Sequence, residues 1–225
     1  MICKFIYHFL HVLIYVVAKL LFRYRAIGAE HIPKKGSAIL ASNHASYFDP
    51  AFAGLGIWRT INYLAKKELF SNPLLTYLLK KIMCAIPVDR EQMDRNTLRR
   101  IYHLLRNNEI ILMFPEGTRT YDGKLMQPKL GIGMVAYNVK VPVIPVYIHG
   151  SYDIWSRNSK NIRPKPCSVY YGPPVDLEPY YRQKKSKELY RKISEKIMGD
   201  IEKIEQKAQE KPNAMRQESV GKIIN

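Results

Sequence analysis

His44 and Asp49 lie five positions apart in the segment NHASYFD, residues 43–49, and together their side chains could catalyse proton transfer. An imidazole accepts a proton near neutral pH, and a carboxylate can fix its tautomer and stabilise the imidazolium, as in the base-and-orienter pair of acyl transfer. On a continuous helix, a separation of five would place the two groups on poorly matched faces, so the pair needs a turn. The alternative is that Asp49 only caps a helix and His44 is an ordinary loop histidine. Taken alone, the pair favours this alternative.

The sequence contains no obvious nucleophile for a covalent acyl intermediate. No Gly-x-Ser-x-Gly elbow occurs, and no reactive cysteine accompanies a nearby histidine. Direct transfer is the simpler chemistry: His44 would activate an acceptor hydroxyl, the hydroxyl would attack a thioester, and backbone N–H groups would stabilise the oxyanion.

A second polar segment, FPEGTR at residues 114–119, could bind a phosphorylated or hydroxylated ligand. Gly117 permits close approach of the backbone, Arg119 can grip a phosphate bidentately, and Glu116 can accept a hydrogen bond from a sugar or glycerol hydroxyl. An ordinary Pro-Glu-Gly turn with solvated charges is the alternative.

Hydrophobic patterning predicts that both segments follow buried strands, at 37–41 and 109–114. Asp49 and Pro50 are typical of a helix start, with Asp49 as N-cap and Pro50 at the first helical position. Further strands are predicted at 61–65, 84–88, 141–148 and 168–171, and helices at 51–57, 72–81, 94–107, 131–138 and 186–208. This alternation predicts an α/β fold with a mixed, largely parallel sheet flanked by helices, in which function gathers beyond the carboxyl ends of the strands.

Residues 5–22 approach the length of about 20 apolar residues that spans a bilayer, but they include two histidines and a lysine. At helical spacing the polar residues form one narrow stripe: Lys4, His8, His11, Tyr15, Lys19 and Arg23. The pattern favours a helix that lies in the membrane interface, or one that packs its stripe against a second element. A transmembrane span, a soluble core helix and a signal peptide are alternatives, although no small-residue cleavage site follows the apolar run.

Length and composition predict one large domain with terminal appendages, because 225 residues with 47% hydrophobic content can bury a full core. The net charge of +17 predicts attraction to polyanions such as nucleic acid, an anionic bilayer or phosphorylated metabolites. Basic residues near the C-terminus interleave with glutamates as on a solvated helix face, which argues against nucleic acid. Three separated cysteines and six scattered histidines predict a reducing, cytoplasmic-facing protein without a structural metal.

Four blocks of sequence, taken in order, resemble the motifs of the lysophospholipid and glycerolipid acyltransferases. They are NHASYFD at 43–49, IPVDR at 86–90, FPEGTR at 114–119 and VPVIPV at 141–146. The resemblance covers about residues 25 to 180 and implies an enzyme like the bacterial 1-acylglycerol-3-phosphate acyltransferases. Such an enzyme moves a fatty acyl chain from acyl-CoA or acyl carrier protein to the free hydroxyl of 1-acylglycerol-3-phosphate, giving phosphatidic acid.

The resemblance also implies residue roles. The catalytic residues would be His44 and Asp49, and the substrate-binding residues would be Arg90, Glu116, Gly117, Thr118, Arg119 and Lys129. Lys129 is included because it belongs to a Lys-x-Gly element that resembles one after the third block of relatives. The fourth block would lie near the acyl-donor site, although its composition alone predicts a buried strand. Cys84 departs from the family, where a small residue such as glycine is usual.

The expected organisation is an amphipathic anchoring helix at 1–27, a catalytic domain at 28–208 and a polar, frayed tail at 209–225. The expected partners are a lysophospholipid, acyl-CoA or acyl carrier protein, and an anionic membrane surface, with no nucleic acid, metal or cofactor. The expected location is the cytoplasmic face of the inner or cytoplasmic membrane, as a peripheral or monotopic protein. Two alternatives stay open: transfer to another lysolipid, such as a lyso-ornithine lipid, or a non-catalytic basic module that binds membranes or nucleic acid.

Overall fold

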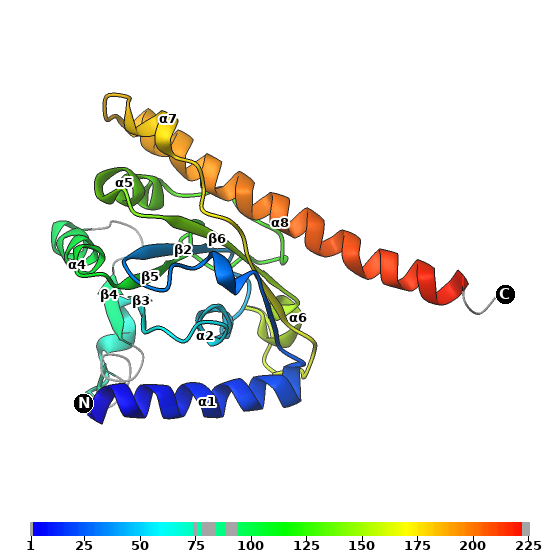
Figure 1. The fold of residues 1–225 in the computed structure, drawn as a ribbon. Coiled ribbons are helices and arrows are strands. Elements are labelled where there is room, and N and C mark those ends of the chain that lie inside the picture. Colours follow the sequence, from blue (N-terminus) through cyan, green and yellow to red (C-terminus); the bar gives the residue numbers. More distant parts are fainter. Residues whose placement is uncertain (1, 74–75, 78–83, 89–93, 222–225) are drawn as a thin grey trace.

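One mixed, largely parallel sheet organises the computed structural model, which describes residues 2–73, 76–77, 84–88 and 94–221. Among these residues, seven strands follow the order β1-β7-β6-β2-β5-β3-β4 (Figure 1). The strands are β1 Arg25–Ile27, β2 Ala38–Ser42, β3 Ile61–Lys66, β4 Ala85–Val88, β5 Ile110–Met113, β6 Val143–His149 and β7 Ser168–Tyr171. Only the β6–β7 pair is antiparallel among the described strands. The predicted α/β fold class is confirmed.

The central strands β2 and β5 are buried along their whole length. Their sequences, AILAS and IILM, are continuous apolar runs, as expected for parallel strands covered on both faces. The two strands pair in parallel, with Ala38 opposite Ile110 and Ala41 opposite Met113. The chain therefore leaves both strands at the same edge of the sheet.

Helices cover both faces of this sheet (Figure 1). Alternate residues of β2 enter different cores: Leu40 packs in one hydrophobic cluster and Ile39 in the other. The first cluster lies under α1 Ile2–Phe22, α2 Asp49–Leu55 and α6 Ser151–Trp155, and the second under α4 Arg95–Arg106, α5 Leu130–Val139 and α8 Lys187–Gly221. The short elements η1 Ala29–His31, η2 Lys67–Phe70 and α7 Glu178–Tyr181 complete the description.

Two buried tyrosine hydroxyls fix α2 against the sheet. Tyr24 donates a hydrogen bond to the carbonyl of Phe52, and Tyr171 donates one to the carbonyl of Ala53, each at 2.9 Å. Both carbonyls belong to α2, the helix that begins at Asp49. The position of α2, and with it Asp49, is thus fixed by Tyr24, which lies between α1 and β1, and by Tyr171 of β7.

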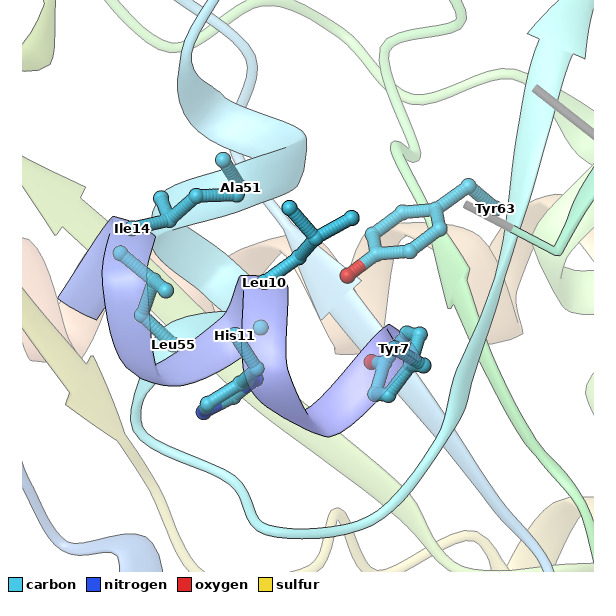
Figure 2. A pocket seen from close by; sticks show the side chains of 8 residues that line it. Tyr7, Leu10, His11, Ile14, Ala51, Leu55 and Tyr63 are labelled. Atoms are coloured by element: carbon cyan, nitrogen blue, oxygen red, sulfur yellow. The ribbon is translucent and has the colours of Figure 1, made fainter. Parts of the chain in front are cut away.

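The N-terminal helix α1 packs one face on the domain and exposes the other. His11, Ala18 and Phe22 are buried, and the His11 ring lies 5.0 Å from that of Trp58. A small cavity of about 80 Å³ remains between α1, α2 and β3, with Leu10 and Tyr63 among its lining side chains (Figure 2). The polar stripe expected from the sequence therefore lies partly against a second element. In the described part of the chain, no helix is both long enough and apolar enough to cross a membrane.

The structure differs from the sequence-based predictions in several places. Helix α1 ends at Phe22 rather than continuing to residue 27, and the short helices α6 and α7 were not predicted. Strand β1 was not predicted, because three exposed residues are too few to show a period. Helix α8 continues to Gly221 rather than ending at Ala208, so the prediction of a frayed tail is wrong as far as Gly221. Residues 205–210, EQKAQE, are strong helix formers that carry the helix onward.

The remaining predicted elements are found with small shifts. The expected strand at 141–148 is the buried strand β6, which begins two residues later. Asp94 caps α4 by accepting a hydrogen bond from the N–H of Thr97 at 2.6 Å. Of the helix predicted at 72–81, Pro73, Thr76 and Tyr77 are helical and Asn72 is not, while residues 74–75 and 78–81 lie outside the described residues.

Candidate active site

The segments that follow β2 and β5 meet at one edge of the sheet and enclose His44. The His44 side chain is buried, with 4% of the residue exposed, and Asp49 is fully buried. A hydrogen bond of 2.9 Å joins Nδ1 of His44 to Oδ2 of Asp49. The structure thus brings together the two residues that the sequence singled out.

Asp49 is held for this contact by the turn before α2. Its Oδ2 also accepts hydrogen bonds from the N–H groups of Ala45 and Ser46, each at 2.6 Å. Asp49 is the first residue of α2, Phe48 is the N-cap, and no side chain caps the helix. The predicted N-cap role of Asp49 is therefore wrong, and so is the alternative in which capping is its only function. Its carboxylate reaches backward to the loop of His44.

The imidazole of His44 is oriented by two contacts. Phe114 stacks on the ring, with centroids 3.9 Å apart and an interplanar angle of 13°. A carboxylate only accepts hydrogen bonds, so Nδ1 carries the proton and Nε2 is the ring nitrogen that can take one from a substrate. This tautomer is the one that a general base requires.

The main chain around His44 is clamped as well. The N–H of His44 donates to Oε1 of Glu116, and its carbonyl accepts from the N–H of Thr120, both at 2.9 Å. The side chain of Asn43 makes two hydrogen bonds to the main chain of Ile148 in β6, at 2.7 and 3.2 Å. The loop is therefore held by both neighbours of β2 in the sheet.

Glu116 is buried at the centre of these contacts, with 3% of the residue exposed. Its second oxygen, Oε2, accepts a hydrogen bond of 3.3 Å from the N–H of Met126. Burial raises the pKa of the Glu116 carboxyl to about 7, although the hydrogen bonds from His44 and Met126 oppose this effect. The sequence predicted an acceptor-binding role for Glu116, whereas in the structure both oxygens accept from the backbone.

We expect Glu116 to make the folded protein less stable as the pH rises from about 4.5 to about 7. The folded state binds more protons than the unfolded chain in this window, so the free energy of unfolding falls with rising pH. The difference between the two pKa values of Glu116 corresponds to a change of about 3 kcal/mol in the free energy of unfolding. Denaturant unfolding of wild type and Glu116→Gln at pH 5 and pH 8 measures this change, because glutamine does not ionise. An identical pH dependence in the two proteins would contradict the assignment.

Gly117 and Lys129 form the next part of the site. Gly117 has a φ of +71°, and a Cβ there would lie 2.8 Å from Cδ of Lys129, so only glycine fits without displacement. The N–H of Lys129 donates to the carbonyl of Pro115 at 2.8 Å, which anchors Lys129 beside the turn. The structure thus places Lys129 with the FPEGTR segment, as the sequence predicted.

Arg119 lies over the ring of Tyr47, with 3.4 Å between the guanidinium carbon and the ring centroid. Its Nη1 is buried and has no hydrogen-bond partner among the described residues. A buried guanidinium nitrogen without a partner is suited to a ligand oxygen. Thr118 lies between Gly117 and Arg119 and is partly buried. Arg90 falls outside the described residues.

Sequence reasoning missed several residues that build the site. Phe114 and Tyr47 stand inside the recognised blocks, where aromatic side chains beside a histidine and an arginine could have suggested stacking. The paired hydrogen bonds of Asn43 and the N–H groups of Thr120 and Met126 have no signal in a single sequence. Burial raises the pKa of the Cys167 thiol, so this cysteine is no nucleophile.

The site combines a buried, oriented base with nearby cationic groups. In the described ranges, no cluster of three His, Cys, Asp or Glu side chains could hold a metal ion. The base can take a proton from a bound hydroxyl, and Arg119 and Lys129 can attract a negatively charged group to the same edge.

Comparison with known proteins agrees with this geometry. Residues 23–149, which include every site segment described above, match the family model of the acyltransferases. A 1-acyl-sn-glycerol-3-phosphate acyltransferase of Limnanthes douglasii is 33% identical over 155 residues, which is 67% of this chain and 54% of that protein. A 1-acyl-sn-glycerol-3-phosphate acyltransferase of Bacillus subtilis (strain 168) is 36% identical over 122 residues, which is 54% of this chain and 60% of that protein. The chain therefore spans little more than half the length of these curated relatives.

A solved structure shares the fold. The 1-acyl-sn-glycerophosphate (LPA) acyltransferase PlsC from Thermotoga maritima superposes with a TM-score of 0.65 and 28% sequence identity. The match covers 81% of this chain and 72% of the other.

Proposed function

The chain belongs to the acyltransferase family, and from this premise we propose that it transfers a fatty acyl chain from acyl-CoA or acyl carrier protein to 1-acylglycerol-3-phosphate. The product is phosphatidic acid. The observation that carries the proposal is the buried 2.9 Å hydrogen bond between His44 and Asp49, at the sheet edge that also holds Arg119. Relatives named as 1-acyl-sn-glycerol-3-phosphate acyltransferases support the choice of acceptor.

The proposed reaction is a direct transfer between two bound substrates. Nε2 of His44 takes the proton of the acceptor hydroxyl as its oxygen attacks the thioester carbonyl carbon. The carboxylate of Asp49 stabilises the imidazolium that forms. The tetrahedral intermediate then collapses, the carbon–sulfur bond breaks, and the imidazolium returns the proton to the leaving thiolate. The products are the new ester and a free thiol.

The phosphate of the acceptor is assigned to the side of the site that carries Arg119 and Lys129, which we call the cationic side. Support comes from Nη1 of Arg119, which is buried without a partner among the described residues, and from the backbone turn at Gly117 beside Lys129. A guanidinium binds phosphate oxygens in a planar, bidentate geometry, which suits this position. Arg90 and Thr118 keep the acceptor-binding roles that the family resemblance implies.

The exposed face of α1 is assigned to the surface of an anionic membrane, on the cytoplasmic side of the inner or cytoplasmic membrane. Large apolar side chains cover this face, including Phe9, Leu13 and Leu20, which are 61%, 51% and 76% exposed. Lys19 and Arg23 are also exposed, and the net charge of +17 favours anionic headgroups. The protein would lie on the membrane rather than cross it.

We expect the double substitution Leu13→Glu and Leu20→Glu to weaken binding to phosphatidylglycerol-containing vesicles by at least about 100-fold, because burying each leucine contributes about 1.5–3 kcal/mol. Vesicle sedimentation measures the partition coefficient. The matched control is Lys185→Gln with Lys192→Gln, which also lowers the net charge by two. Lys192 lies in α8 and Lys185 two residues before that helix, and α8 covers the face of the sheet opposite to α1. Equal losses in the two double variants would refute the role of α1 and indicate attraction by charge alone.

A panel of lysolipids tests the proposed function. Purified protein receives 1-acylglycerol-3-phosphate, other lysophospholipids or a lyso-ornithine lipid, each with acyl-CoA and with acyl carrier protein, while thiol release and the lipid product are followed. We expect phosphatidic acid as the main product. Preferred turnover of another lysolipid would overturn the choice of acceptor. Binding to vesicles without turnover of any lysolipid would overturn the enzymatic proposal in favour of a basic binding module.

A further inference from the structure

Given the acyl transfer proposed above, on which this step rests, we infer that Glu116 is a positioning residue that holds the main chain of His44, and not a ligand of the acceptor. The carboxylate spans two loops that the chain forms far apart in sequence. It receives the N–H of His44 on Oε1 at 2.9 Å and the N–H of Met126 on Oε2 at 3.3 Å. Only 3% of the residue is exposed.

The donors of these bonds, together with the burial of Glu116, distinguish the two roles. A carboxylate that binds a substrate hydroxyl presents an oxygen to the space where the substrate lies. In Glu116 each oxygen instead accepts a hydrogen bond from a backbone N–H group, and only 3% of the residue is exposed to a ligand. Buried N–H groups are costly to leave unpaired, so the loops of His44 and Met126 depend on this side chain.

The clamp on His44 is two-sided. Glu116 accepts from the N–H of His44, and the N–H of Thr120 donates to its carbonyl, while Phe114 stacks on its ring. All three contacts come from one segment that continues β5, residues 114–120. The Asp49 carboxylate sets the tautomer and rotation of the imidazole, whereas Glu116 sets where the backbone that carries the imidazole lies.

The second bond links the base to the cationic side of the site. Met126 belongs to the loop that leads to Lys129, and the N–H of Lys129 returns to the carbonyl of Pro115. One buried carboxylate therefore fixes the distance between the base and the segment that carries Lys129. Displacing a catalytic base by about 1 Å can lower the rate about 100-fold, so the distance between His44 and this segment matters for the chemical step.

The kinetic test uses three variants, with the acceptor concentration varied at saturating donor. We expect Glu116→Ala to lower kcat by about 10- to 100-fold with the acceptor KM changed less than about 2-fold. Glu116→Gln keeps an oxygen at the same reach for the N–H of His44, and it should recover kcat to within about 5-fold of wild type. Glu116→Asp keeps the charge but shortens the reach, and its loss should again fall on kcat. Glu188→Ala, at an exposed position of α8, is the control.

Amide hydrogen exchange measures how firmly Glu116 holds the main chain of His44, and it does not depend on enzymatic activity. In Glu116→Ala the His44 amide should exchange at least about 10-fold faster, while the amides of β2 stay protected and serve as the internal reference. In Glu116→Gln the His44 amide should stay close to wild type. If the alanine variant fails to fold, the aspartate and glutamine variants supply the same comparison.

Two results would overturn the inference: a rise in acceptor KM at unchanged kcat, which would return Glu116 to acceptor binding, or unchanged exchange at the His44 amide in the alanine and aspartate variants. If the wild-type protein transfers no acyl group to any lysolipid, the proposed function fails, whereas the exchange measurement still decides whether Glu116 holds the loop.

Discussion

Replacing His44 with alanine should lower kcat for acyl transfer by about 1000-fold, because general-base catalysis contributes about 10² to 10⁴. The His44 imidazole is oriented by a carboxylate, and imidazoles are the side chains that most often act as general bases. Steady-state rates with saturating donor and acceptor measure the loss. Turnover near the wild-type rate would refute the mechanism.

The His44→Ala variant must also be shown to fold, because His44 is more buried than a loop position suggests. Its ring stacks on Phe114, and its loss leaves a small cavity beside Asp49. Asp49 keeps two backbone hydrogen bonds, from Ala45 and Ser46, so the cost should be about 1–3 kcal/mol. A domain with about 5–15 kcal/mol of stability tolerates this loss. His103→Ala, at an exposed site on α4, is the matched control and should keep full activity.

The substitution Asp49→Asn should reduce kcat by about 100- to 1000-fold while preserving the fold. The amide oxygen of asparagine can replace Oδ2 as the acceptor for the N–H groups of Ala45 and Ser46, so the turn before α2 survives. The negative charge that stabilises the imidazolium is lost, which removes part of the general-base catalysis. Thermal unfolding and kcat are measured on the same preparation.

The control for this variant is Asp153→Asn, since Asp153 is an exposed carboxylate on α6. Wild-type kcat in a folded Asp49→Asn protein would show that the charge of Asp49 is unnecessary, and Asp49 would then only shape the loop. A fall in the melting temperature of more than about 10 °C would show that its structural role dominates.

The central part of the fold could be predicted because its buried strands have a recognisable apolar sequence. The runs AILAS in β2 and IILM in β5 are apolar throughout, and each ends in a polar segment. Parallel neighbours release those segments at one edge, which is why His44 and Glu116 meet across 72 residues of sequence. The exposed, three-residue strand β1 has no such pattern, since tertiary pairing with β7 alone makes it a strand.

The members of the site were easier to identify than their partners. His44, Asp49 and Arg119 are residue types whose chemistry is evident, but the sequence does not say which atoms they contact. The carboxylate of Glu116 looked available for a ligand, yet it accepts from the backbone of His44 and Met126. Backbone N–H groups are present at every residue except proline, so only the folded chain shows which of them a side chain will satisfy.

The position of β2 between β5 and β6 also governs when the site can form. Strand β2 precedes both neighbours in the chain, and the contacts that hold its loop come from Glu116 and, 105 residues from Asn43, from Ile148. Contacts of such long range close late in folding, because their loop entropy must be overcome first. A ribosome-bound chain therefore carries His44 for much of its synthesis before the contacts that hold its loop can form. The proposed acyl transfer accordingly requires that β6 has been made and has entered the sheet.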